Sequence, residues 1–179
     1  DGASARVVAR AFKPADPGAI HGYVESDGVV AMEASRCMRA VAAQGATWKE
    51  IPNLGRTGSG VAAFPALAPV QKPGAGARLE YDFHAFEAGE LTVEITLAPT
   101  LDFKGQGGMR YAVSVGDEPP TLVNVNDDPS EKAWEAIVAR NAHVRRTTHR
   151  TEAPGPQTIK LWLVDPGLVF QRIVAFRGD

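Results

Sequence analysis

Two stretches near the middle of the chain alternate between apolar and polar residues. Residues 79–85 carry apolar side chains at every second position, and residues 91–97 repeat the pattern. A period of two places one set of side chains on a core face and the other toward solvent, as in a half-buried β-strand. Because Ala88, Gly89 and Glu90 between these stretches suit a tight connection, the sequence predicts that the two strands pair as a hairpin.

Short apolar runs separated by turn residues fill most of the remaining chain. They lie at residues 29–32, 48–51, 61–64, 111–115, 122–125, 159–164 and 168–176. The 18 glycines and 13 prolines favour frequent turns over long helices. The spacing is typical of an all-β protein, and we predict an antiparallel β-sandwich at residues 25–179. Residues 1–24 show no clean period and are interpreted as a lead-in or linker.

One short helix is predicted after residue 128. Asp128 has the chemistry of an N-cap, Pro129 suits the first helical position, and Glu131 completes a capping box. An apolar face follows, and the helix is expected to end near Asn141. That face is made by Trp134, Ile137 and Val138.

The charge balance excludes several classes of partner. The chain holds 19 Lys and Arg against 21 Asp and Glu, a net charge of −2, which argues against a nucleic-acid surface. No run approaches the roughly 20 apolar residues of a transmembrane helix, so no membrane partner is expected.

The single cysteine, Cys37, rules out an intrachain disulfide. The chain begins with Asp1 instead of methionine, which predicts a processed protein or a piece of a longer one.

No catalytic motif emerges from the residues. The four histidines lack a zinc-ligand spacing, and no G-x-S-x-G nucleophile motif is present. The glycine-rich segment at residues 55–60 lacks the Lys-Ser/Thr of a phosphate-binding loop and leads into no helix. No catalytic residue is predicted.

Saccharide binding is the more plausible chemistry, because aromatic faces and a few polar groups suffice for it. Trp48 lies among polar neighbours and suits either the core or a ligand platform. Trp134 suits the core or a stacking surface on the helix. Arg56, in its glycine-rich loop, could bind a carboxylate through two hydrogen bonds or simply face solvent. The oxygen-rich segment at residues 124–128 suits either a turn or a calcium ion.

Several segments in order resemble the C-terminal domain of glycoside hydrolase family 115, the xylan α-1,2-glucuronidases. The resemblance runs from about residue 20 to the end of the chain. The matching segments are residues 27–34, 54–61, 78–83, 97–103, 110–114, 117–120 and 161–167, together with Trp134 and Asn141. It implies a jelly-roll sandwich of the carbohydrate-binding-module type, with catalysis performed by upstream domains that this chain does not contain.

The chain also looks distantly like carbohydrate-binding module families 6 and 35, which hold a structural calcium ion. Their early strand carries a Glu-Ala-Glu, with an acidic partner near the C-terminus. Here the segment reads Glu33-Ala34-Ser35, so the second glutamate is missing. The resemblance leaves Glu33 and Asp165 as the expected calcium ligands.

These observations lead to two functional hypotheses. In the first, the chain is a non-catalytic module that binds xylan or glucuronoxylan. Trp48 and Trp134 would stack on sugars, Arg56 would pair with a uronate, and Asn141 would bond a hydroxyl. In the second, the domain has no sugar affinity and serves docking onto upstream catalytic domains or homodimerisation. The resemblance implies a secreted or periplasmic protein.

Overall fold

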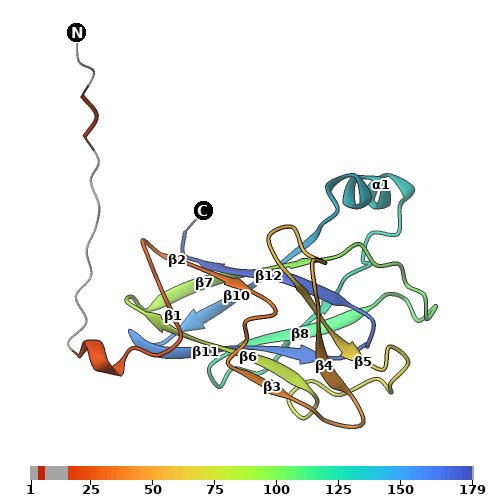
Figure 1. Ribbon diagram of the computed structural model, residues 1–179, viewed down its shortest axis with the longest axis horizontal. Coiled ribbons are helices and arrows are strands. Elements are labelled where there is room, and N and C mark those ends of the chain that lie inside the picture. The colour runs from red at the N-terminus through yellow and green to blue at the C-terminus, as the bar shows by residue number, and fades with distance from the viewer. Residues whose placement is uncertain (1–3, 7–15, 179) are drawn as a thin grey trace.

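The computed structural model describes residues 4–6 and 16–178, and within them the chain forms two stacked β-sheets (Figure 1). Sheet A has the strand order β1-β6-β11-β8-β9, with β3 also paired to β6, and sheet B has the order β10-β7-β12-β5-β4, with β2 also paired to β12. The strands of sheet A are β1 (Tyr23–Val24), β3 (Arg39–Val41), β6 (Arg78–Ala85), β8 (Arg110–Val115), β9 (Thr121–Asn124) and β11 (Gly155–Leu163). The strands of sheet B are β2 (Val29–Glu33), β4 (Thr47–Ile51), β5 (Gly60–Phe64), β7 (Gly89–Leu97), β10 (His143–Thr151) and β12 (Val169–Phe176). The predicted all-β sandwich is therefore confirmed.

The end of the predicted lead-in belongs to the sandwich. A short 3₁₀ helix, η1 (Pro17–Ala19), precedes β1, whose two residues pair in parallel with β6. All other strand pairs of the described residues are antiparallel. Residues 1–3 and 7–15 of the predicted lead-in lie outside the described part of the chain.

The core fills the space between the two sheets. Alternate side chains of β6 and β11 point into it from sheet A, and those of β7 and β12 point into it from sheet B. The largest fully buried side chains are Tyr81, Tyr111, Phe83, Phe170, Met32, Leu79, Leu91, Ile95, Leu97, Met109, Ile159 and Leu161. Removing this much apolar surface from water is the main term that favours folding.

The predicted hairpin between residues 79–85 and 91–97 is wrong. Strand β6 pairs with β11, β3 and β1, whereas β7 pairs with β10 and β12 in the other sheet. The short connection at residues 86–88 carries the chain across the core from sheet A to sheet B. Both alternations report inward-facing apolar residues correctly, but the pattern does not say which strand lies beside which.

The helix α1 (Glu131–Arg140) has its N-cap two residues later than predicted. Ser130 is the N-cap and accepts a hydrogen bond from the Ala133 N–H, whereas Asp128 accepts from the Ser130 N–H in the preceding turn. The helix ends as expected at Asn141, which adopts the left-handed conformation with φ of 49°. A short polar side chain tolerates that conformation better than a bulky one, so Asn suits this cap.

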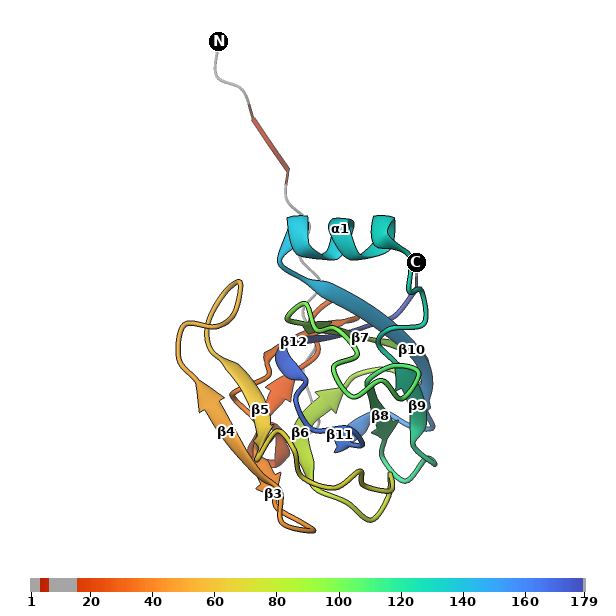
Figure 2. The ribbon, with the colours of Figure 1, turned by 90° about the vertical axis from the view of Figure 1, so that its right-hand side faces the viewer.

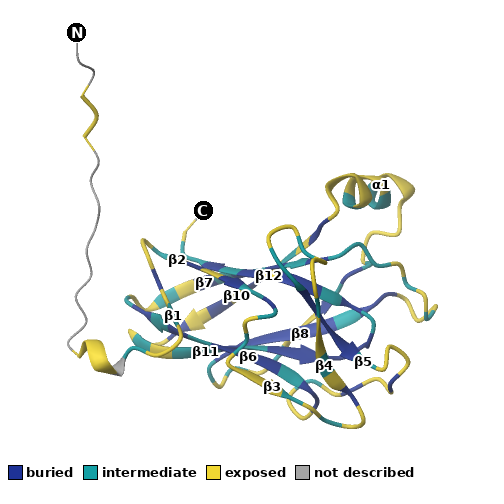
Figure 3. Ribbon diagram, in the orientation of Figure 1, coloured by how far each residue is buried: buried dark blue, intermediate teal, exposed yellow. Residues whose placement is uncertain are grey.

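Helix α1 stands off the body of the sandwich (Figure 2). No residue of the helix is buried, and its ribbon shows only intermediate and exposed positions (Figure 3). Among the described residues, no helix has the length and apolar character needed to cross a membrane. On the apolar face predicted for this helix, Trp134 and Ile137 are half-buried and Val138 is exposed.

A charge network on the outer face of sheet A ties the short strand β3 to β6. The Arg39 guanidinium donates to both carboxylate oxygens of Asp82 at 2.6 Å and also contacts Glu80. Glu80 accepts a second contact from Arg78. The bonds from Arg39 hold the pKa of Asp82 below its usual value. Burial works against ionisation of Glu80, but the Arg39 and Arg78 bonds outweigh it and also lower its pKa.

We expect the Arg39→Met substitution to lower the free energy of unfolding at neutral pH by about 1 kcal/mol, because two carboxylates each lose one of their partners. Carboxyl groups whose pKa is lowered by folding stabilise the protein above their unfolded values, here 4.5 and 3.8, and this stability is lost as the pH falls below them. The difference in urea unfolding between the two proteins should therefore be full at neutral pH and shrink progressively as the pH falls below these values. The matched control is Arg36→Met, which removes an exposed arginine. If R39M had the same loss of unfolding free energy in acid as at neutral pH, this account would be contradicted.

Candidate functional site

A small hollow of about 260 Å³ lies where the loop between β4 and β5 meets the outer face of sheet B. The loop contributes Arg56 and Thr57, β12 contributes Gln171 and Arg172, and β7 contributes Thr96. The backbone N–H of Arg56 donates to the buried Gln171 side chain at 3.2 Å, which fixes the loop against β12. We call this cavity the arginine hollow.

Both guanidinium groups of the arginine hollow are free to receive a ligand. No ion pair or side-chain hydrogen bond within the described residues engages the guanidinium of Arg56 or of Arg172. The nearby Glu33 carboxylate accepts from the Thr57 hydroxyl at 2.6 Å. Two unpaired guanidiniums around one concave space favour an anion, and the planar fork of arginine matches a carboxylate.

The arginine hollow continues into a row of side chains across sheet B. Cross-strand register places Val144 of β10 beside Thr96, Thr96 beside Arg172, and Arg172 beside Glu33. Val144 lies only three residues after Asn141, the cap of α1. The helix therefore rises from the same end of sheet B that carries the hollow.

Trp134 and Asn141 stand at this end without a core role for their side chains. Trp134 is half-buried on a helix that has no buried residue, so the core interpretation of this ring is not what the structure shows. The backbone N–H of Asn141 bonds the carbonyls of Ile137 and Val138, and the residue itself is exposed. Neither residue lines the arginine hollow itself.

Trp48 does not form a free stacking platform. Its indole N–H donates to the Val41 carbonyl at 3.2 Å, and its ring packs at 6.2 Å from Phe170 at the edge of the core. The partial exposure of this residue comes from its position on the outermost strand of sheet B. The structure favours the core interpretation of Trp48, because its polar atom and its ring are both already engaged.

The expected calcium ligands are each bonded to groups of the protein. Glu33 ends a strand of sheet B and bonds Thr57, while Asp165 follows β11 of sheet A and accepts from the backbone and guanidinium of Arg110 at 2.9 and 2.8 Å. Asp165 is 1% exposed. No group of three or more His, Cys, Asp or Glu suited to a metal was found in the described part of the chain. Calcium prefers six to eight oxygen ligands, so this donor set does not fit one ion shared by Glu33 and Asp165.

The oxygen-rich segment at residues 124–128 is a turn. Asn124 donates to the Gly107 carbonyl and accepts from the Asn126 N–H. Asn126 in turn bonds the backbone of Met109 and Thr100. The Asn124 and Asn126 side chains connect the loop at residues 98–108 to the segment that precedes the helix. Their hydrogen-bonding groups are already engaged by backbone atoms.

Sequence reasoning found Arg56 but missed the other residues of the hollow. The signal for Arg172 was present, since an arginine interrupts the apolar residues of the last strand. A register shift between Phe170 and Arg172 turns Gln171 inward and Arg172 outward. Such a bulge is set by the pairing of three strands and is not visible in a linear pattern.

Comparison with known proteins places the chain in a family. Residues 22–179 match the glycosyl hydrolase family 115 C-terminal domain, and the chain belongs to that family. No curated protein sequence matches significantly. The fold is shared with a family GH115 4-O-methyl-α-glucuronidase described as specific for decorated arabinogalactans, with a TM-score of 0.66 at 16% identity. That alignment covers 87% of this chain but 18% of the enzyme.

Isolated carbohydrate-binding modules share the same fold over nearly their whole length. A family 6 module of a laminarinase from Zobellia galactanivorans aligns with a TM-score of 0.53 at 14% identity, covering 83% of this chain and 99% of the module. A family 35 module from Clostridium thermocellum gives 0.54 at 14% identity, covering 82% and 98%. The predicted relationship to family 115 and to the module-type sandwich is thus confirmed.

We expect calcium to leave the thermal midpoint of this chain unchanged, because Glu33 and Asp165 are each satisfied by protein groups. The Asp165→Asn substitution should lower the free energy of unfolding by about 2 kcal/mol, since Arg110 loses its charged acceptor. Differential scanning calorimetry with calcium and with a chelator measures both effects. A midpoint that rises with calcium in the unsubstituted chain, but not in D165N, would restore Asp165 as a metal ligand.

Proposed function

We propose that this domain is a non-catalytic module that binds glucuronoxylan or a related polysaccharide bearing uronate side groups. The observation that carries the proposal is the pair of unpaired guanidiniums, Arg56 and Arg172, in one hollow on a module-type sandwich. The family membership supports a place beside glycoside hydrolase domains, and with it a secreted or periplasmic setting. The chain aligns with 18% of the family 115 enzyme structure, which supports an accessory role beside the other domains of such a parent.

Recognition would begin with the uronate carboxylate. Arg56 and Arg172 donate to its two oxygens, and Thr57 and Thr96 offer hydroxyls to the ring substituents. The Trp134 ring supplies an apolar face for a neighbouring sugar of the chain, and Asn141 supplies an amide. A neutral xylan would gain only the contacts to the Trp134 ring and to the neutral polar side chains, so the hollow discriminates by charge.

We expect Arg56→Met and Arg172→Met each to weaken binding to glucuronoxylan at least about tenfold, because each removes a charge-assisted hydrogen bond to the carboxylate. Affinity electrophoresis in glucuronoxylan, arabinoxylan, uronate-bearing arabinogalactan and a sugar-free gel measures the effect. Lys72→Met is the matched control, since it removes an exposed cation from a loop outside the hollow.

The gel separates the possible outcomes. Retardation by the uronate-bearing polysaccharides that both arginine variants lose, and that K72M keeps, supports the arginine hollow. Equal retardation of all four proteins would refute the role of the two arginines. The Trp48→Ala variant adds a further check, because its core position predicts lost stability with unchanged retardation at a temperature where it is folded.

The helix supports a second candidate function, docking or homodimerisation without sugar affinity. The specific observation is that α1 buries none of its residues although Trp134, Ile137 and Val138 share one face. Val138 is 49% exposed, an unusual position for an apolar residue on an amphipathic face. A second copy of this chain, or an upstream domain of its parent, would cover that face.

We expect the Val138→Asp substitution to shift any monomer–dimer equilibrium toward the monomer by at least about tenfold, because it places a charge in an apolar contact. Analytical ultracentrifugation over a concentration series measures the equilibrium. Ala139→Asp is the control, since it adds the same charge on the opposite side of the helix. A dimer equally weakened by both variants, or unaffected by V138D, would remove the helix face from the interface.

A further inference from the structure

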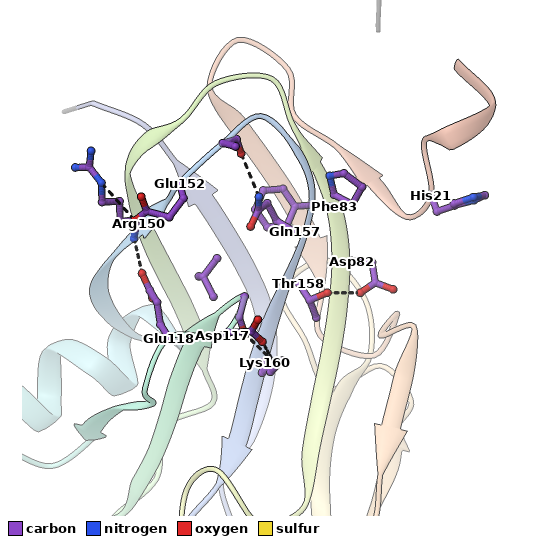
Figure 4. Close-up of a pocket in the computed structure, with 14 residues that line it drawn as sticks. His21, Asp82, Phe83, Asp117, Glu118, Arg150, Glu152, Gln157, Thr158 and Lys160 are labelled. Atoms are coloured by element: carbon purple, nitrogen blue, oxygen red, sulfur yellow. Dashed lines mark hydrogen bonds and ion pairs between the residues drawn. The ribbon is translucent and has the colours of Figure 1, made fainter. Parts of the chain in front are cut away.

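A second and larger hollow, of about 880 Å³, lies at the far end of β10 from the arginine hollow (Figure 4). The polar side chains that line it include Asp82, Asp117, Arg150, Glu152, Gln157 and Lys160. On β10, Val144 lies at the end beside the arginine hollow, and Arg150 lies at the end beside this second hollow. Six residues of extended strand span about 20 Å, so the two cavities are separate sites. We call this cavity the β11 hollow.

The β11 hollow exists because one strand of sheet A stops short. Strand β8 pairs with β11 only from Ile159 to Leu163, while β11 itself begins at Gly155. The Gly116 N–H donates to the Thr158 carbonyl at 2.9 Å, after which the chain turns away from the sheet. Within the described residues, no strand occupies the place beside residues 155–158 on that side. The volume falls within the usual range of ligand sites.

Two loosely closed ion pairs line the β11 hollow. The Lys160 ammonium lies 3.7 Å from the Asp117 carboxylate, and the Arg150 guanidinium lies 3.7 Å from Glu152. The other ion pairs of the described residues measure 2.9 Å or less. Asp117 is fully exposed and Glu152 is 86% exposed in their side chains, so neither carboxylate is held in place. Each pair offers an acceptor and a donor side by side, which is the complement of two neighbouring hydroxyls.

The remaining walls of the β11 hollow are fixed by bonds within the protein. Asp82 accepts from Arg39 and from the Thr158 hydroxyl at 2.7 Å, so its carboxylate is already oriented. Glu118 accepts from the Arg150 backbone and bonds the buried His149 ring at 2.9 Å. A site with rigid walls loses little entropy when it receives a ligand.

The charge of the β11 hollow selects against acidic sugars. Asp82 is already paired with Arg39, and the other three carboxylates that line it, those of Asp117, Glu118 and Glu152, face the two cations Lys160 and Arg150. A uronate would meet a net negative surface, whereas an uncharged sugar would not. Pro156 is exposed beside these polar groups, and its apolar ring suits the C–H face of a sugar ring.

We propose that the β11 hollow is a second saccharide site, which takes a neutral, hydroxyl-rich sugar residue while the arginine hollow takes the uronate. Neighbouring hydroxyls of the sugar insert into the Lys160–Asp117 pair and the Arg150–Glu152 pair. With both sites filled, the domain holds a decorated polysaccharide at two points, which raises its retention without any new contact.

The test is an NMR titration of the ¹⁵N-labelled chain that carries both R56M and R172M, so that failure of the arginine hollow cannot mask the result. The probes are an unsubstituted β-1,4-xylo-oligosaccharide, a neutral β-1,3-galacto-oligosaccharide and free glucuronic acid. We expect a neutral probe to shift the amide signals of Gly116, Asp117 and Gln157, and glucuronic acid to leave them unchanged. Asp117→Ala and Lys160→Met should each weaken this binding at least about fivefold.

Two matched variants control for the removal of charge. Glu87→Ala and Lys72→Met remove an exposed carboxylate and an exposed ammonium outside the β11 hollow, and both should bind as the parent does. The proposal is overturned if neither neutral probe shifts the three amides, or if glucuronic acid shifts them equally. Binding that D117A and K160M leave intact would also overturn it.

Discussion

The burial of two apolar sheet faces against each other is the constraint on which the rest of this structure depends. Tyr81 and Phe83 enter the core from sheet A, and Ile95 and Ile173 meet them from sheet B, all at most 1% exposed. Because side chains alternate along a strand, every inward residue leaves its neighbours facing outward. The core therefore fixes which side chains the two outer faces and the loops can present, including both hollows.

The two hollows are different consequences of this packing. The arginine hollow forms where a loop from β4 folds onto the outer face of sheet B, held by the contact of Arg56 with the buried Gln171. The β11 hollow forms where β8 ends before β11 does. One carries unpaired guanidiniums and the other an excess of carboxylates, so the same sandwich presents sites of opposite charge near opposite ends of β10.

Particular residues show which features of the structure the sequence pattern predicted and which it did not. Alternation identified Leu79, Tyr81 and Phe83 as core residues, since a period of two is a local property. It failed on the pairing of β6 with β7, because strand neighbours follow from the fit of the whole sandwich. The helix was found from its apolar spacing, but its cap moved from Asp128 to Ser130, because neighbouring serine and aspartate offer competing caps. Arg56 was chosen from its glycine-rich context, whereas Arg172 required the bulge in β12.

The sequence by itself determined the fold class, most of the strands, the α-helix and the family, because these follow from local periodicity, turn residues and ordered segments. Only the tertiary structure decided that Trp48 belongs to the edge of the core, that Asp165 is bound by Arg110, and that Arg56 and Arg172 face one cavity. These outcomes depend on which distant segments become neighbours, and that is fixed by the packing of two sheets as a whole. A residue's type shows what it can bind, but its neighbours in space decide whether that capacity is already used.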